Sequence, residues 1–151
     1  MRQVLVVDED RSFLEKAQKG LGNYRQYFSV LVADNLDDVY ADLKKHTISV
    51  LVLNLREPIM DGLSLLKELS SKYPDVQLIV TAEPGAANIL RLAEENNAEA
   101  FLQKPIEIEP LVKAIMVALK KEAEGGTLKD VSPGMFLQLI QMEEKSCTVR
   151  A

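Results

Sequence analysis

The chain alternates short apolar runs with longer segments of helical periodicity, and the alternation occurs five times. Each run has the length of a buried strand, and each is followed by apolar residues spaced three or four apart. Strands that alternate with helices form a parallel sheet covered on both faces, because right-handed crossovers return the chain to the same edge. The sequence therefore predicts a doubly wound α/β fold with five parallel strands, at residues 4–7, 28–33, 48–53, 76–80 and 100–102.

Polar side chains follow four of these strands at the point where each strand ends. The carboxyl ends of parallel strands lie at one edge of the sheet, where open α/β sheets bind their ligands. Residues far apart in the sequence are therefore expected to form one polar site suited to phosphate or metal, built from Asp8, Glu9, Asn54, Thr81 and Lys104.

The stretch from Val50 to Gly62, VLVLNLREPIMDG, is central to this prediction. A buried strand ends on Asn54, a loop containing Pro58 follows, and Asp61 opens a helical pattern that runs from about Gly62 to Tyr73. Taken alone, Asn54 fits a simple strand end as well as it fits a site. The polar ends of the other strands favour the site.

Two helix starts carry recognisable signals. Asp34 or Asn35 is expected to cap the helix after the second strand. Pro84 is expected in the first turn of the helix after the fourth strand, where its missing N–H costs nothing.

Composition narrows the class of protein. The net charge is −5 without a basic cluster, which argues against direct binding to nucleic acid or an anionic membrane. The single cysteine, Cys147, excludes an internal disulfide. The apolar run at residues 4–7 is too short for a signal peptide or a membrane span. We therefore predict a cytoplasmic protein.

Four motifs, VLVVDED, VLVLNLREPIMDG, LIVTAEP and AFLQKP, occur in an order and spacing that resembles the receiver domain of two-component response regulators. The resemblance covers residues 2–122. It implies a flavodoxin-like sheet of strand order 2-1-3-4-5 and a phosphorelay signalling module that is not an enzyme. A sensor histidine kinase or a downstream signalling protein is the implied partner. Residues 1–122 are then the receiver domain and residues 123–151 an extension.

The resemblance also implies roles for individual residues. Asp8 and Glu9 match the acidic pair that binds Mg²⁺, and the backbone carbonyl of Arg56 matches a further ligand. Among the residues that act on the phosphoryl group, Thr81 matches the hydroxyl that hydrogen-bonds it and Lys104 the lysine that pairs with it. Pro105 is expected after a cis peptide bond, and Phe101 matches the aromatic side chain that turns inward on activation.

Asn54 departs from the family pattern, which has the phospho-accepting aspartate at this position. An amide lacks the carboxylate nucleophile that acyl-phosphate formation requires. The loss of one charged oxygen is expected to weaken Mg²⁺ binding, and the amide NH₂ is expected to donate to Asp8 or Glu9. Two interpretations stay open, a natural pseudo-receiver and an engineered substitution that silences an ordinary receiver. We favour the first, because nothing else in the chain looks altered.

The extension resembles the opening of a PATAN-type domain. Gly125-Gly126 breaks the last helix of the receiver, a strand or turn is expected at residues 127–131, and Ser132 is placed to cap a helix. Another strand is expected within residues 146–149. The alternative is an accessory helix that packs on the receiver or on another copy. If the extension is a truncated second domain, Phe136, Leu137 and Ile140 are left exposed, and self-association through this helix is then expected, in the simplest case as a homodimer.

The resemblance implies that signals leave through the surface of the fourth helix, the fifth strand and the fifth helix. Arg91, Glu94 and Glu95 are candidate contacts there, although solvated charges on that helix explain them equally well.

Two other functions fit parts of the sequence. Asp8, Thr81 and Lys104 follow the order of a haloacid-dehalogenase phosphatase with Asp8 as nucleophile, but no acidic pair ends a strand after Lys104. A ligand-binding flavodoxin-like domain needs a glycine-rich or hydroxyl-rich phosphate cradle, which the first turn, DEDRS, lacks. Both alternatives are therefore less favoured than the receiver.

Overall fold

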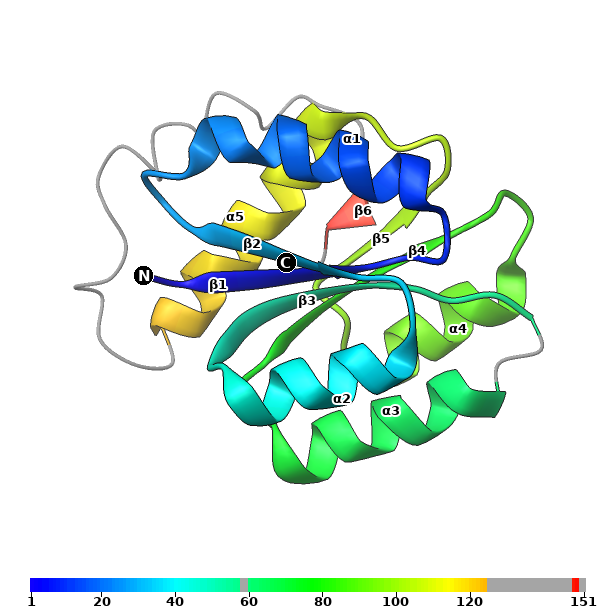
Figure 1. Cartoon of the computed structure of the whole chain (residues 1–151). Helices are drawn as coiled ribbons and strands as arrows, with labels where there is room; N and C mark the ends of the chain where they lie inside the picture. The colour runs from blue at the N-terminus through cyan, green and yellow to red at the C-terminus, as the bar shows by residue number, and fades with distance from the viewer. Residues whose placement is uncertain (58–59, 125–147, 150–151) are drawn as a thin grey trace.

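The computed structural model describes residues 1–57, 60–124 and 148–149, and contains one sheet with helices on both faces (Figure 1). The strands are β1 (Gln3–Val7), β2 (Ser29–Ala33), β3 (Ile48–Asn54), β4 (Gln77–Ala82), β5 (Ala100–Gln103) and β6 (Thr148–Val149). The helices are α1 (Arg11–Leu21), the 3₁₀ turn η1 (Gly22–Tyr24), α2 (Leu36–Lys45), α3 (Met60–Lys72), α4 (Ala87–Glu95) and α5 (Ile108–Glu124).

The strand order is β2-β1-β3-β4-β5-β6. The first five strands are parallel, so the predicted doubly wound sheet of order 2-1-3-4-5 is confirmed. β6 adds a further strand to this sheet and runs antiparallel to β5. The strand expected within residues 146–149 is present as β6. Its pairing with β5 could not be predicted from the alternation of strands and helices.

Two apolar cores lie on opposite faces of the sheet. Successive strand residues point to opposite faces, so Val6 packs with α1 and α5 whereas Leu5 packs with α2, α3 and α4. Figure 1 shows these two helix layers on either side of the strands. β1 and β3 are buried from both sides, which explains why their sequences are continuous apolar runs.

Three helix starts can be compared with the sequence. Asn35 caps α2, since its side-chain oxygen accepts the backbone N–H of Asp38 at 2.8 Å. Asp10 caps α1 by accepting from the N–H groups of Ser12 and Phe13. The expectation for Pro84 is wrong. The chain turns at Pro84-Gly85, where Gly85 has the left-handed φ of +83°, and α4 begins only at Ala87.

The predictions for residues 125–147 lie outside the described residues, among them the Gly125-Gly126 helix break, the capped helix after Ser132 and the self-association surface. In the described ranges, no helix is both long enough and apolar enough to cross a membrane.

Candidate functional site

The carboxyl ends of β1, β3, β4 and β5 bring together the side chains that the sequence predicts. Asn54 and Thr81 are register partners on β3 and β4, and Asp8 follows β1 directly. Lys104 follows β5, and its backbone N–H is held by the carbonyl of Ala82 at 2.8 Å. The four side chains therefore meet because adjacent parallel strands end together.

Asp8 and Lys104 form a buried ion pair. Their Oδ2 and Nζ atoms are 2.7 Å apart, and the side chains are only 2% and 15% exposed. The other carboxylate oxygen of Asp8 accepts the backbone N–H of Asp10 at 2.9 Å. The Lys104 ammonium also lies 5.1 Å from the centre of the Phe13 ring, at a distance typical of a cation–π contact. The charge of Asp8 is therefore neutralised within the protein.

Asn54 is tied to Thr81. Its Nδ2 donates to the hydroxyl oxygen of Thr81 at 3.0 Å and approaches the Thr81 carbonyl oxygen at 3.3 Å. The expectation that this amide donates to Asp8 or Glu9 is therefore wrong. The strand register places Thr81 beside it, whereas the carboxylates of Asp8 and Glu9 are engaged by other groups.

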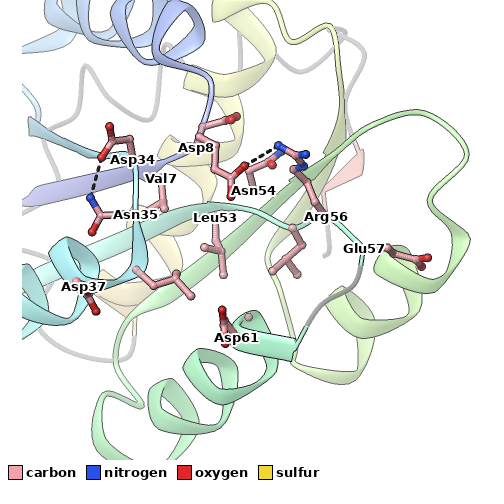
Figure 2. A pocket seen from close by; sticks show the side chains of 14 residues that line it. Val7, Asp8, Asp34, Asn35, Asp37, Leu53, Asn54, Arg56, Glu57 and Asp61 are labelled. Carbon is pink, nitrogen blue, oxygen red and sulfur yellow. Dashed lines mark hydrogen bonds and ion pairs between the residues drawn. The ribbon is translucent and has the colours of Figure 1, made fainter.

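Glu9 lies at the surface of the site and pairs with Arg56. Its Oε2 is 2.7 Å from the guanidinium Nη1 of Arg56, and the two side chains are 72% and 60% exposed. Figure 2 shows the Arg56 side chain near Asn54, with a dashed line for this ion pair. The resemblance assigned Arg56 a role through its backbone carbonyl alone, whereas the structure shows its side chain neutralising Glu9.

Phe101 is buried on the other face of the sheet. It pairs in register with Val80, one residue before Thr81, and packs in the core beneath α2, α3 and α4. The side chain is thus already turned inward in this structure. The Lys104–Pro105 peptide bond is cis, as the resemblance implies.

A cavity of about 690 Å³ opens next to Asn54, between the ends of β1 and β3 and the starts of α2 and α3 (Figure 2). Asp34 lies on its wall, and the pKa of its carboxyl is lowered by the side-chain hydrogen bond from Asn35 and then by the charge of Arg11, 2.6 Å away. Most of the polar groups around the cavity are acidic. The lining includes Asp8, Glu9, Asp34, Asn35, Asp37, Asn54, Arg56, Glu57 and Asp61.

A hard divalent cation needs several charged or polar oxygens. In this arrangement Asp8 offers a carboxylate that is paired with Lys104, and Glu9 offers one that is paired with Arg56. Among the described residues, no group of three or more acidic, histidine or cysteine side chains is placed to hold a metal. The side chains as they stand fit Mg²⁺ poorly, since both acids would have to leave a cationic partner.

Two contacts at the site were missed from the sequence. The first is Phe13, which belongs to the apolar face of α1, and nothing in the sequence marks its ring as the neighbour of Lys104. The guanidinium of Arg56 was missed because ion pairing across two loops leaves no local pattern. A basic residue two positions after the strand end is the one signal available.

Comparison with known proteins gives a consistent result. The family model described as "Response regulator receiver domain" matches residues 4–116. The chain is 31% identical over 124 residues to the DNA-binding transcriptional regulator NtrC of Salmonella typhimurium. It is 20% identical to the transcriptional regulatory protein DegU of Brevibacillus brevis, over 82% of this chain and 51% of that protein.

The match to NtrC covers 80% of this chain but 25% of NtrC, so the chain spans about a quarter of that relative. Among solved structures, a CheY-like receiver domain from Methanospirillum hungatei matches with a TM-score of 0.73 at 19% identity, covering 83% of this chain and 99% of that one. A receiver domain of a LuxO repressor protein from Vibrio parahaemolyticus matches with a TM-score of 0.74 at 18% identity, covering 85% and 98%. These matches support the flavodoxin-like fold and do not favour the phosphatase alternative.

Proposed function

Because the chain belongs to the response regulator receiver domain family, we propose that it is a receiver-type signalling and interaction module in which Asn54 takes the acceptor position and accepts no phosphoryl group. Receiver domains in general are signalling modules that interact with kinases and downstream effectors. The proposal keeps the interaction role and removes the phosphoryl switch.

The observation that carries the proposal is the contact between Asn54 and Thr81. The amide occupies the end of β3 and donates to the hydroxyl of Thr81 at 3.0 Å. A nucleophilic acceptor needs a charged oxygen at this place, whereas the amide nitrogen is a donor and the amide oxygen is neutral. The Thr81 hydroxyl thereby has a protein partner without any phosphoryl group.

Weak Mg²⁺ binding is part of the same proposal. Receiver domains generally bind Mg²⁺ at the acidic site, where the ion supplies positive charge for phosphoryl transfer. In this chain the proposed ligands are Asp8, Glu9, the backbone carbonyl of Arg56 and the oxygen of Asn54, with one carboxylate fewer than an aspartate at position 54 provides. The ion pairs of Asp8 with Lys104 and of Glu9 with Arg56 add to the cost of binding a cation.

Intact mass spectrometry after incubation with Mg²⁺ and acetyl phosphate tests the proposal. The parent chain is expected to keep its mass, and Asn54→Asp is expected to gain one phosphoryl group, because the substitution restores the carboxylate nucleophile. Asn54→Ala serves as the matched control, since it removes the Thr81 contact without adding a nucleophile. A phosphoryl group on the parent chain would refute the proposal and make Asp8 the first acceptor to examine.

Calorimetric titration with Mg²⁺ alone tests the metal part separately. Asn54→Asp is expected to bind at least about tenfold more tightly than the parent, since it adds one charged oxygen ligand. Equal affinities would show that the amide is as good a ligand as the carboxylate in this site.

The proposed partner is a sensor histidine kinase or a downstream signalling protein, without direct binding of nucleic acid or membrane, and the proposed location is the cytoplasm. Arg91, Glu94 and Glu95 are exposed on α4 and are the candidate contacts for such a partner. Because Asn54 removes the chemical switch, binding of the partner is expected to be independent of acetyl phosphate.

A further inference from the structure

The outer edge of β5 is occupied by a strand from a distant part of the chain. β5 is the last of the parallel strands, and the edge of such a strand presents N–H and C=O groups that can accept another strand. Here β6 takes that place, with Ala100 opposite Val149 and Phe101 opposite Thr148. Figure 1 shows β6 beside β5.

The pairing is antiparallel, in contrast to the rest of the sheet. Antiparallel strands need no crossover helix, so any extended segment that reaches this edge can pair there. Thr148 and Val149 are both β-branched, which suits a pleated backbone. The structure thus contains both the edge and a segment that fits it.

The covalent connection does not force the pairing to be intramolecular. Residues 125–147 separate α5 from β6, and a chain of about 20 residues has a maximum reach of roughly 70 Å. A domain of this size has a radius of gyration of only about 15 Å. The segment of one copy therefore has the length to reach the β5 edge of another copy.

The edge is also close to the candidate site. Phe101, opposite Thr148, lies in the middle of β5, and Lys104, which pairs with Asp8, follows the end of this strand directly. At the beginning of β5, Glu99 is held by Lys121 of α5 through an ion pair of 2.8 Å. β5 is thus anchored at both ends, which presents its edge as a rigid template.

We propose that the β5 edge is a strand-docking surface whose occupant is the segment Thr148–Val149, supplied by the same copy in dilute solution and by a second copy at high concentration. Each copy carries one edge and one segment, so reciprocal exchange gives a closed twofold dimer. A tethered segment has an effective concentration in the millimolar range. The intramolecular form is therefore favoured at protein concentrations below that range. The inference depends on the fold and is independent of the chemistry of Asn54.

Two proline substitutions in the full chain, Thr148→Pro with Val149→Pro, test the surface. Proline lacks the N–H that a ladder needs, so the backbone amide of β5 that faces β6 within Ala100–Phe101 is expected to exchange with deuterium at least about tenfold faster than in the parent, whereas the amides that face β4 keep their exchange rates. The exchanged pair Thr148→Val with Val149→Thr keeps both β-branched positions and is the matched control, with parental exchange expected. Parental exchange in the proline variant would overturn the proposal. Circular dichroism establishes that the variant is folded, and Thr148→Pro alone is the milder replacement if it is not.

A synthetic peptide with the sequence of residues 145–151, carrying serine at position 147, tests docking from another molecule. At millimolar concentration it is expected to restore slow exchange at β5 in the proline variant, whereas the same peptide with prolines at positions 148 and 149 is not. Sedimentation of the parent up to about millimolar concentration should show a growing dimer fraction that the proline variant lacks. A peptide without effect, or a parent that stays monomeric throughout, would overturn the docking of a second copy.

Discussion

The side-chain nitrogen of Asn54 lies 3.0 Å from the hydroxyl oxygen of Thr81, and the two residues are register partners on adjacent parallel strands. In the proposed assignment, Asn54 stands at the phospho-acceptor position of the receiver family, and Thr81 stands at the position of the hydroxyl that bonds the phosphoryl group. In this chain the two side chains are hydrogen-bonded directly to each other. The ends of β3 and β4 are therefore joined by a side-chain hydrogen bond.

Because of this hydrogen bond, substitutions at Asn54 and Thr81 are expected to have non-additive effects on the free energy of unfolding. Asn54→Ala, Thr81→Val and the double variant form a cycle, and the coupling in the free energy of unfolding is expected at about 0.5–1.5 kcal/mol, the net value of a partly buried hydrogen bond. Urea denaturation monitored by circular dichroism measures it. Additive effects of the two single substitutions would mean that the contact contributes nothing to stability.

Breaking the two ion pairs at the site is expected to lower the free energy of unfolding by different amounts, although their N···O distances are equal. Both have an N···O distance of 2.7 Å, but Asp8–Lys104 is buried and Glu9–Arg56 is exposed. Lys104→Met leaves a buried carboxylate without its cation and is expected to lower the free energy of unfolding by about 3–5 kcal/mol. Arg56→Met, the matched control, is expected to cost less than about 1 kcal/mol. Similar losses for both variants in denaturant unfolding would contradict the assigned burial.

Gly20 lies where α1 packs closely against the start of α5, so a larger side chain at this position is expected to destabilise the fold. A Cβ atom at this position of α1 would lie 2.6 Å from Cγ1 of Ile108, at the start of α5. Gly20→Ala is expected to destabilise the protein by about 1–3 kcal/mol through overpacking, despite the higher helix propensity of alanine. Gly22→Ala, with nothing within 4 Å, is the control and should be neutral or stabilising. The thermal midpoint of each variant measures the difference, and adding Ile108→Ala should relieve the effect of Gly20→Ala.

The Tyr40 phenol is expected to make the stability of the fold depend on pH in the alkaline range. Burial raises the pKa of its phenol above the ordinary value of 10.0, and the charges of Glu68 and Asp61 raise it further. Because the unfolded chain ionises first, the contribution of this group to stability is complete below about pH 10 and is lost as the pH rises through the folded pKa. Ultraviolet titration of phenolate absorbance should show a late-titrating component that Tyr40→Phe removes. An unchanged late component in that variant would assign it to another tyrosine.

The parallel sheet and most of the site could be predicted because each depends on a local pattern. Apolar runs such as Val50–Leu53 identify buried strands, and parallel strands end at a common edge. Asp8, Asn54, Thr81 and Lys104 could therefore be grouped without coordinates. Local turn chemistry was less certain, as Pro84 illustrates, since both a turn and a first helical position suit proline.

The sequence by itself determined which chemical groups stand at the strand ends, including the amide in place of a carboxylate. Only the tertiary structure decided how those groups pair. Asn54 bonds Thr81 because the β3–β4 register sets them side by side, and Asp8 meets Lys104 because β1 and β5 end at the same edge of the sheet. The pairing of β6 with β5 was likewise decided in three dimensions. Hydrogen bonds and ion pairs act over about 3 Å, and residues so far apart in sequence come within that distance only when the whole sheet has formed.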